Sequence, residues 1–206
     1  MDERRQSASP TTGPPGPAAG HVLVVGATRV LRPAVGTLAA RGASVTAVAR
    51  TAGELDALAR ESPGDVRPLA ADATADDFGA RLRRAGGPAG FTGALVYAPA
   101  LPPRAVTGQV AASLDAGPLV LILTSEWAAP GNGAPASAAW APHLLPAGAR
   151  PGDACRPLVL GWRGTGPAVR WHTPEEISAA ALALLDDPRG TDAVLGEVRP
   201  WTARPS

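Results

Sequence analysis

The sequence predicts a single α/β domain built around a doubly wound parallel sheet. Between residues 21 and 126, short apolar runs alternate with stretches of helical periodicity, which is the pattern of repeated strand–helix–strand units. The first apolar run, HVLVV, leads directly into Gly26, as a buried parallel strand leads into a tight turn. The chain of 206 residues is long enough to bury one core of ordinary size.

The expected elements follow one another in a regular order. Strands are expected over residues 21–25, 43–49, 66–71, 93–97 and 118–124, and helices over residues 33–41, 52–60, 76–85 and 106–116. The first of these helices ends at Gly42, a favourable C-terminal cap. The run 118–124, PLVLILT, is the most apolar, so we expect it at the centre of the sheet.

The C-terminal third is less regular. Residues 127–152 are rich in Pro, Gly and Ala and have no periodicity, which predicts a substrate loop or lid. Strand character returns at residues 156–162 and 193–198. Between them, residues 173–186 predict a helix, because Thr173 suits the N-cap, Pro174 the first helical position and Glu176 the closing residue of a capping box.

The composition excludes several classes of function. A formal net charge of +1 gives no basic field for nucleic acid, and no apolar run approaches the ~20 residues of a membrane span. The single cysteine, Cys155, excludes an internal disulfide and a cysteine-based metal cage, and we expect no metal. Residues 1–20 are proline-rich without a signal-peptide core, which predicts a disordered leader and a cytoplasmic protein.

The stretch from Val24 to Ala34, VVGATRVLRPA, stands where a dinucleotide-binding fingerprint belongs, after a strand and before a helix. It resembles the first turn of the short-chain dehydrogenases/reductases, which commonly reads GASRGIG. The resemblance extends over about residues 21–198 and implies a Rossmann-like fold of that type.

The same resemblance implies roles for the turn residues. Gly26 would make the tight turn, Thr28 is the small hydroxyl residue, and Arg29 matches the arginine that many members direct at a 2′-phosphate. Val30 and Arg32 replace the family's other two glycines, which normally let the backbone approach a pyrophosphate. Arg32 would either fill that space or bind a phosphate at the helix N-terminus. The alternative is a turn that binds nothing.

Three further positions extend the implied cofactor site. Arg50, at the end of the second expected strand, suits the 2′-phosphate of NADP(H), where an acid would suit the free hydroxyl of NAD. Asp72 matches the family's acid after the third strand, and Ala98 matches the small residue after the fourth. The implied cofactor is therefore NADP(H), with the site retained, vestigial or lost as open alternatives.

The family's catalytic residues are largely missing. Ser125, directly after the fifth expected strand, matches the serine that hydrogen-bonds a substrate oxygen. The family's Tyr–Lys pair has no counterpart, because the chain contains no lysine and its only tyrosine, Tyr97, comes too early. Trp140 and His143 occupy the corresponding region, where His143 is a candidate acid or base.

The C-terminal segments CRPLVLGW, from Cys155, and RWHTPEEI, from Arg170, resemble small bacterial proteins related to the same family. In that comparison Cys155 replaces a tyrosine, and the sequence offers no base to activate it as a nucleophile. His172 is a further candidate acid or base, with a position before the helix N-cap as the alternative.

Tryptophans are unusually frequent in the same third of the chain. Trp127, Trp140 and Trp162 suit an apolar, planar or polycyclic small-molecule substrate. They equally suit a repacked core or the interface of a homodimer, and these alternatives remain open.

These features together predict an atypical enzyme of bacterial specialised metabolism. The missing Tyr–Lys pair favours non-redox chemistry on an apolar small molecule, such as cyclisation, isomerisation or dehydration. An NADP-dependent oxidoreductase with a different proton donor, or a non-catalytic nucleotide- or ligand-binding protein, are the alternatives.

Overall fold

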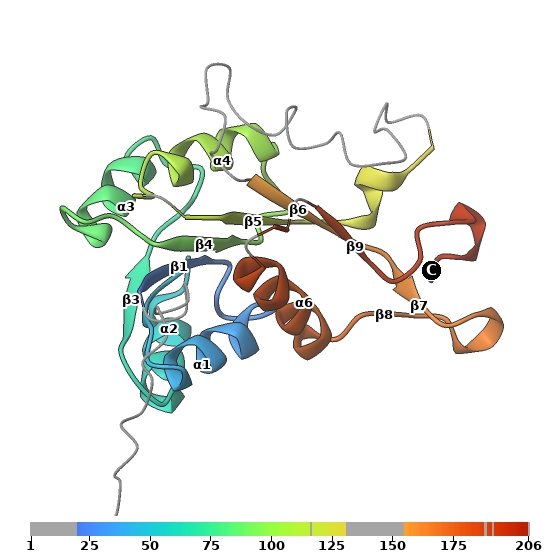
Figure 1. The fold of residues 1–206 in the computed structure, drawn as a ribbon, viewed down its shortest axis with the longest axis horizontal. Coiled ribbons are helices and arrows are strands. Elements are labelled where there is room, and N and C mark those ends of the chain that lie inside the picture. The colour runs from blue at the N-terminus through green and yellow to red at the C-terminus, as the bar shows by residue number, and fades with distance from the viewer. Residues whose placement is uncertain (1–19, 116, 131–154, 188, 191, 206) are drawn as a thin grey trace, which may run out of the picture.

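The computed structural model describes residues 20–115, 117–130, 155–187, 189–190 and 192–205. These residues form a parallel sheet of seven strands in the order β3-β2-β1-β4-β5-β6-β9, covered by helices on both faces (Figure 1). The strands are β1 (His21–Val25), β2 (Ser44–Ala49), β3 (Val66–Ala70), β4 (Gly93–Val96), β5 (Leu119–Leu123), β6 (Cys155–Leu160) and β9 (Ala193–Leu195). The predicted fold class, one doubly wound α/β domain, is confirmed.

Two apolar layers hold the sheet between its helices. Helices α1 (Arg32–Ala40), α2 (Ala52–Glu61) and α6 (Pro174–Asp186) cover one face, and α3 (Phe78–Gly86) and α4 (Pro103–Ala111) cover the other (Figure 1). Alternate residues of the central strands enter alternate layers. Leu95 of β4 lies in the layer under α1 and α6, whereas Val96 lies in the layer under α3 and α4.

Two expected elements differ in position. The fourth helix was expected over 106–116, but it begins at Pro103 because proline suits the first helical turn. It ends early because the chain turns back to Phe91, whose N–H donates to the Ser113 carbonyl at 3.1 Å. The expectation that 118–124 is central was also wrong, since β4 has three strands on each side and β5 lies next to it.

The expected strand 156–162 is divided in two. β6 ends at Leu160, and β7 (Trp162–Arg163) pairs in antiparallel fashion with β8 (Arg170–Trp171). The division occurs at Gly161, where an added Cβ would lie 2.1 Å from the Glu197 carbonyl oxygen. This close approach of the chain after β9 redirects the backbone into a hairpin that projects from the sheet (Figure 1).

Helix α6 is capped at both ends by side chains. Its predicted capping box is confirmed: Thr173 accepts from the Glu176 N–H at 3.3 Å, and the Glu176 carboxylate accepts from the Thr173 N–H at 3.0 Å. At the other end, the buried Arg156 of β6 donates to the carbonyl oxygens of Leu184 at 2.6 Å and Asp187 at 2.5 Å. A guanidinium there stabilises the negative end of the helix dipole.

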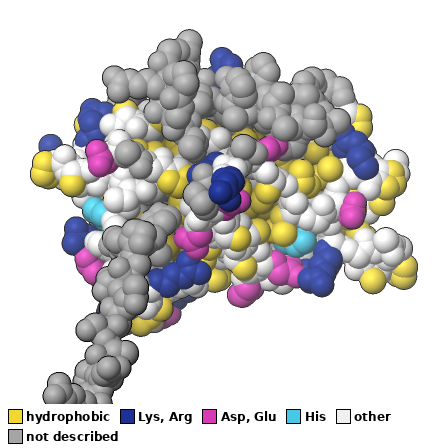
Figure 2. Space-filling view, viewed as in Figure 1, with side chains coloured by type: hydrophobic (Ala, Val, Ile, Leu, Met, Phe, Trp, Pro, Cys, Tyr) yellow, Lys and Arg dark blue, Asp and Glu magenta, His cyan; other side chains and the backbone are white. Residues whose placement is uncertain are grey.

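The visible surface mixes charges of both signs. Figure 2 shows arginine side chains next to acidic ones across this face, without a single-sign patch. No helix among the described residues is long and apolar enough to span a membrane. Residues 1–19 of the expected leader and 131–152 of the expected loop lie outside the described residues, as do the candidates Trp140 and His143.

Candidate functional site

The carboxyl ends of the central strands form the candidate site. β1 pairs with β4 through Val25 and Val96, and Val96 pairs in turn with Leu121 of β5. The residues that follow these strands, Gly26 and Tyr97 among them, therefore lie at one edge of the sheet. In doubly wound sheets this edge, at the point where the strand order reverses, is where ligands bind.

Gly26 makes a turn that no other residue type fits. Its φ is +83°, and an added Cβ would lie 2.4 Å from the Tyr97 carbonyl oxygen. The N–H groups of Gly26 and Ala27 both donate to the Val48 carbonyl oxygen, at 2.9 and 3.1 Å. The turn is thus anchored to β2 and β4, and it delivers the chain to the first turn of α1.

The residue at the first of the two lost glycine positions packs inward. Val30 is partly buried against the core layer that includes α1 and α6. Its carbonyl oxygen accepts a hydrogen bond from the Ser178 hydroxyl of α6 at 3.1 Å. The valine side chain is therefore directed into the protein, so the outer surface of the turn stays available to a phosphate group.

Arginines at this edge divide into paired and unpaired residues. Arg32 forms an ion pair with Glu61 of α2, which gives its guanidinium a protein partner in place of a phosphate. Arg29 is exposed, and no ion pair involves it within the described part of the chain. Arg50 is exposed after β2 and approaches Asp72 closely enough to help lower the pKa of that carboxyl.

Asp72 is held in a local turn. Its carboxylate accepts hydrogen bonds from the Thr74 N–H at 2.9 Å and the Thr74 hydroxyl at 2.8 Å. These two bonds, and then the charge of Arg50, hold the pKa of Asp72 below its ordinary value. The side chain is thus an ionised acceptor at neutral pH, at the edge where the resemblance places an adenine contact.

The remaining cofactor and catalytic candidates occupy the same edge. Thr28 is half-buried in the turn, and Ala98 is half-buried after β4 against the layer under α3 and α4. Ser125 follows β5 and opens a 3-10 helix, Ser125–Ala128 (η2). Its side chain is partly exposed, and no hydrogen-bond partner for it is present among the described residues.

His172 occupies a packed position before α6. Its side chain is only 5% exposed, and Nδ1 lies 3.3 Å from a Glu176 carboxylate oxygen. Nε2 is buried without a hydrogen-bond partner. An added Cβ at Gly196 would lie 2.4 Å from Nε2, so the turn after β9 covers the ring. In this conformation the ring is closed to a substrate, and its catalytic role remains a prediction.

The described tryptophans do not form one substrate surface. Trp162 is 1% exposed and packs edge-on against Trp171, at 6.5 Å between ring centroids, and against Trp201, at 6.1 Å. Trp127 instead packs against the core layer under α3 and α4. This arrangement favours the packing alternative for Trp162, as a small core that holds the β7–β8 hairpin and the C-terminal segment together.

Cys155 lies inside the sheet and is unsuited to nucleophilic chemistry. It is 5% exposed at the start of β6, and burial raises the pKa of its thiol to about 12. Because the thiolate is the reactive form, the thiol is inert at neutral pH. Within the described ranges, no group of three or more His, Cys, Asp and Glu side chains is placed to hold a metal ion.

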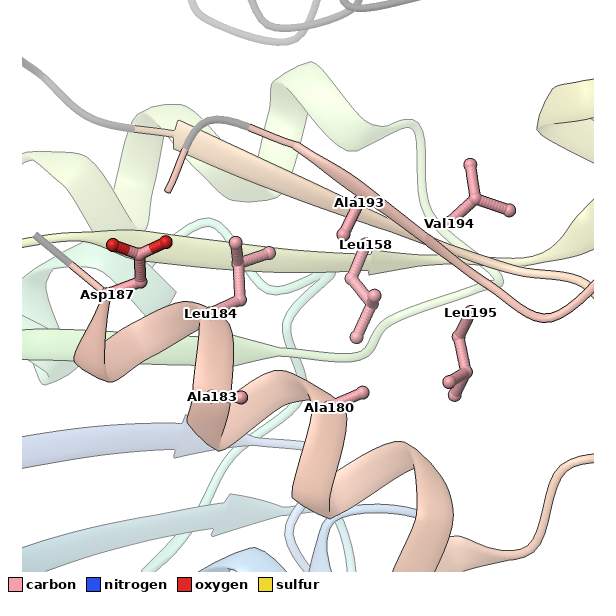
Figure 3. Close-up of a pocket in the computed structure, with 8 residues that line it drawn as sticks. All are labelled: Leu158, Ala180, Ala183, Leu184, Asp187, Ala193, Val194 and Leu195. Carbon is pink, nitrogen blue, oxygen red and sulfur yellow. The ribbon is translucent and has the colours of Figure 1, made fainter. Parts of the chain in front are cut away.

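A separate apolar groove lies between α6 and the edge strand β9. It has a volume of about 290 Å³ and is lined by Leu158, Ala180, Ala183, Leu184, Asp187, Ala193, Val194 and Leu195 (Figure 3). Val194 and Leu195 point to opposite sides of β9, and Val194 is 45% exposed. The lining residues come from α6 and its C-cap Asp187, from β6 and from β9, and they include none of the candidate cofactor residues.

The fold has many solved counterparts. A short-chain type dehydrogenase/reductase from Mycobacterium ulcerans matches with a TM-score of 0.63 and 17% identity, over 89% of this chain and 90% of that one. A metagenomic short-chain oxidoreductase in complex with NADP matches with a TM-score of 0.59 and 15% identity, over 86% of this chain and 97% of that one. A 3-oxoacyl-[acyl-carrier protein] reductase from Brucella melitensis with bound NAD matches with a TM-score of 0.59 and 15% identity, over 93% of this chain and 95% of that one.

The comparisons with solved structures identify the fold of this chain. At these identities they establish that this chain has the fold of the short-chain dehydrogenases/reductases, as the turn at Gly26 predicts. No protein-family model matches the sequence, and no curated relative matches it significantly. The chain is therefore a divergent example of that fold.

Sequence reasoning missed several contacts at this edge. It did not predict that the Ser178 hydroxyl donates a hydrogen bond to the Val30 carbonyl oxygen. Nor did it predict that Arg163 and Arg170 both form ion pairs with Glu176, at 2.7 and 2.8 Å. Hydrogen-bond partners 148 residues apart, such as Ser178 and Val30, leave no local signal in one sequence. The capping-box pattern did reveal that Glu176 is structurally important.

Proposed function

We propose that this protein is an atypical enzyme of the short-chain dehydrogenase/reductase type that binds an NADP(H)-type dinucleotide at the carboxyl edge of its sheet. The turn at Gly26 carries the proposal. It has a positive φ and leads into α1, whose first turn contains no acidic residue and no side-chain cap. The Arg32 N–H already donates to the Arg29 carbonyl oxygen at 3.2 Å and Pro33 has no N–H, so the dipole of α1 would supply most of its attraction for phosphate.

The residues around this turn suit such a nucleotide. Thr28 and the backbone after Gly26 would face the pyrophosphate, and Val30 leaves that surface free because it packs inward. Arg29 and Arg50 would hold the 2′-phosphate, with Asp72 and Ala98 near the adenosine. Arg32 is better explained by its ion pair with Glu61. When bound, a nicotinamide nucleotide supplies hydride chemistry.

On the substrate side, Ser125 would hydrogen-bond an oxygen of a small molecule at the end of β5. The family's proton transfer is unavailable because the chain has no lysine. We therefore propose non-redox chemistry on an apolar substrate of bacterial specialised metabolism, such as cyclisation, isomerisation or dehydration. A second candidate, NADP-dependent reduction with a different proton donor, is favoured by Arg29, which has no ion-pair partner among the described residues.

Partner, assembly and location stay predictions. We expect a small-molecule substrate, no nucleic-acid or membrane partner, a cytoplasmic location and, as the open alternative for the tryptophans, a homodimer.

The test is a titration of NADPH and NADH into the purified protein, followed by calorimetry. We expect tighter binding of NADPH. Arg50→Ala should weaken NADPH by about 1–3 kcal/mol, the scale of one charge-assisted hydrogen bond, and leave NADH nearly unchanged. Arg60→Ala removes an exposed arginine from the last turn of α2 and serves as the matched control. Equal affinity of the wild type for both nucleotides would refute the assignment of Arg50.

The chemistry needs a separate test. NADPH oxidation with simple ketones and aldehydes should not exceed background, because a positioned proton donor contributes about 10²–10⁴-fold. Rapid reduction of such carbonyls would favour the second candidate.

A further inference from the structure

Ser178 is the one polar residue among the buried residues of α6, and it is 2% exposed. The other buried residues of this helix are apolar: Ile177, Ala181, Leu182, Leu184 and Leu185. Burial of a hydroxyl costs free energy unless the hydroxyl forms a hydrogen bond, and serine is a weaker helix former than alanine. A serine at this position therefore needs a contact that offsets both costs.

The contact that Ser178 makes lies outside its own helix. Other hydroxyls in helices or directly after them donate to a carbonyl oxygen three or four residues earlier in the chain, namely those of Thr37, Ser62, Thr107 and Ser113. Such a local bond is common for a serine or threonine in a helix. The Ser178 hydroxyl instead donates to the Val30 carbonyl oxygen at 3.1 Å, 148 residues away in the chain. It thereby joins α6 to the segment between Gly26 and α1.

The Val30 carbonyl depends on this bond. Within the described part of the chain, no backbone N–H donates to its oxygen. The start of α1 supplies no donor to it, because Pro33 has no N–H and the Arg32 N–H donates to the Arg29 carbonyl oxygen. Val30 is partly buried, so Ser178 provides the partner that a carbonyl group in such a position requires.

The same bond sets the orientation of the peptide group between Val30 and Leu31. This peptide is trans, so its C=O and its N–H point in opposite directions. Because the carbonyl is held toward α6, the Leu31 N–H points away from α6. No backbone oxygen in the described ranges accepts a hydrogen bond from that N–H. Ser178 thus fixes the backbone at the point where the Gly26 turn leads into α1.

The helix that carries Ser178 is itself held in place near this position. Glu176, two residues earlier, closes the capping box with Thr173 and forms ion pairs with Arg163 and Arg170. Helices α1 and α6 pack against each other on the same face of the sheet (Figure 1). A side chain on an anchored helix positions its partner more precisely than one on a loop. The hydroxyl of Ser178 therefore gives the turn a fixed reference point.

We propose that Ser178 is a positioning residue for the dinucleotide, because its hydroxyl holds the Val30–Leu31 peptide in the orientation that the bound ligand requires. This inference rests on the proposed function. Ser178 acts through Val30, and a turn that already has its bound conformation loses less freedom when the ligand binds. The backbone of the turn is the same for both nucleotides. Ser178 should therefore serve NADPH and NADH alike, in contrast to Arg50, which should serve only NADPH.

Calorimetric titration of Ser178→Ala with NADPH and with NADH tests this role. Without the bond, the turn samples other orientations, and the dissociation constant rises in inverse proportion to the fraction that stays competent. The contribution of one hydrogen bond limits this rise to about 3- to 10-fold, and we expect the same factor for both nucleotides. Ser113→Ala is the matched control. It removes a hydroxyl that is 4% exposed and donates to the Val110 carbonyl oxygen at 2.7 Å, after α4, and it should bind both nucleotides normally.

A second pair of variants separates the hydroxyl from the packing around it. Ser178→Thr and Ser178→Val have nearly the same shape, so any overpacking by the added methyl group is common to both. Ser178→Thr keeps a hydroxyl and should bind both nucleotides about 3- to 10-fold more tightly than Ser178→Val. This comparison decides the question if Ser178→Ala does not fold. A hydroxyl with a purely structural role would change the melting temperature within each pair and leave the dissociation constants of the folded proteins equal.

The outcomes separate the two proposals. If the wild type binds NADPH but both pairs show equal dissociation constants, the role of Ser178 is wrong and the proposed function stands. A loss confined to NADPH would also overturn the inference, since it would act at the 2′-phosphate and not through the backbone of the turn. If neither nucleotide binds the wild type, the proposed function fails and the inference fails with it.

Discussion

Gly26 is the residue on which the geometry of the candidate site depends most directly. Its φ of +83° lies in the left-handed region, and the Tyr97 carbonyl oxygen occupies the space of a Cβ. Gly36, in the middle of α1, has an ordinary helical conformation, and an added Cβ would have no atom within 4 Å apart from its own chain neighbours and the adjacent helix backbone. The backbone conformation and the surrounding atoms thus require a glycine at position 26 but not at position 36.

We therefore expect opposite effects from the same substitution. Gly26→Ala should destabilise the fold by about 1–3 kcal/mol because it combines backbone strain with a steric overlap. Gly36→Ala should stabilise it by about 0.5–1 kcal/mol because alanine is the better helix former. Urea unfolding monitored by circular dichroism measures both. A neutral Gly26→Ala would show that the turn relaxes at little cost.

Much of this residue-level picture was accessible from sequence. Gly26 was identified by its place after an apolar run, because a buried strand that leads into a glycine is a signal within a few neighbouring residues. Arg32 was not, since its partner Glu61 belongs to another helix. In the sequence alone, an arginine at the start of a helix suggests a phosphate ligand. The tertiary structure shows instead that Arg32 forms an ion pair with a carboxylate.

At the scale of elements, the start of α6 holds the β7–β8 hairpin to the sheet. The Glu176 carboxylate accepts from Arg163 of β7 at 2.7 Å and from Arg170 of β8 at 2.8 Å, besides the Thr173 N–H. His172 Nδ1 faces the same carboxylate. The hydrogen bonds of Arg170 and the Thr173 backbone, foremost among these, hold the pKa of Glu176 well below its ordinary value.

This lowered pKa predicts how acid affects the junction. A carboxyl whose folded pKa is below the unfolded one contributes stability that is present above the unfolded value, 4.5, and is lost as pH falls through the folded value. Wild type should therefore exceed Glu176→Gln in stability at pH 6, and the difference should shrink as pH falls below about 4.5.

The neighbouring Glu175 provides the control, because it is exposed in the same first turn and outside the network around Glu176. Thermal unfolding of Glu175→Gln should parallel the wild type between pH 6 and 3. An unchanged difference between wild type and Glu176→Gln over this range would mean that the carboxylate charge is not what joins the hairpin to α6.

At the scale of the whole molecule, Cys155 reports on the integrity of the sheet. It pairs with Leu119 in the interior of the sheet and is 5% exposed. Both its burial and its raised pKa of about 12 require that the sheet open before the thiol can react.

Thiol labelling with Ellman's reagent at pH 8 measures how often the sheet opens at Cys155. We expect labelling of the native protein to be slower than that of the urea-unfolded chain by at least about 10³-fold, because the native thiolate fraction is about 10⁻⁴. The native rate should rise with urea in parallel with global unfolding. Rapid stoichiometric labelling without urea would indicate that the edge of the sheet containing β6 and β9 opens locally.

The alternation of apolar runs and helices determined the fold class of this protein. Sequence signals also located the turn at Gly26 and the capping box at Thr173, and they excluded Tyr–Lys catalysis because no lysine exists. Each of these properties depends on residues close together in the chain or on residue types being absent from it, so one sequence contains them completely.

Only the tertiary structure decided which polar groups are already paired. It paired Arg32 with Glu61, brought the Ser178 hydroxyl to the Val30 carbonyl oxygen and buried the His172 ring against Gly196. The reason is physical: a hydrogen bond or ion pair depends on the distance between groups in space, and folding brings together residues that the sequence keeps far apart.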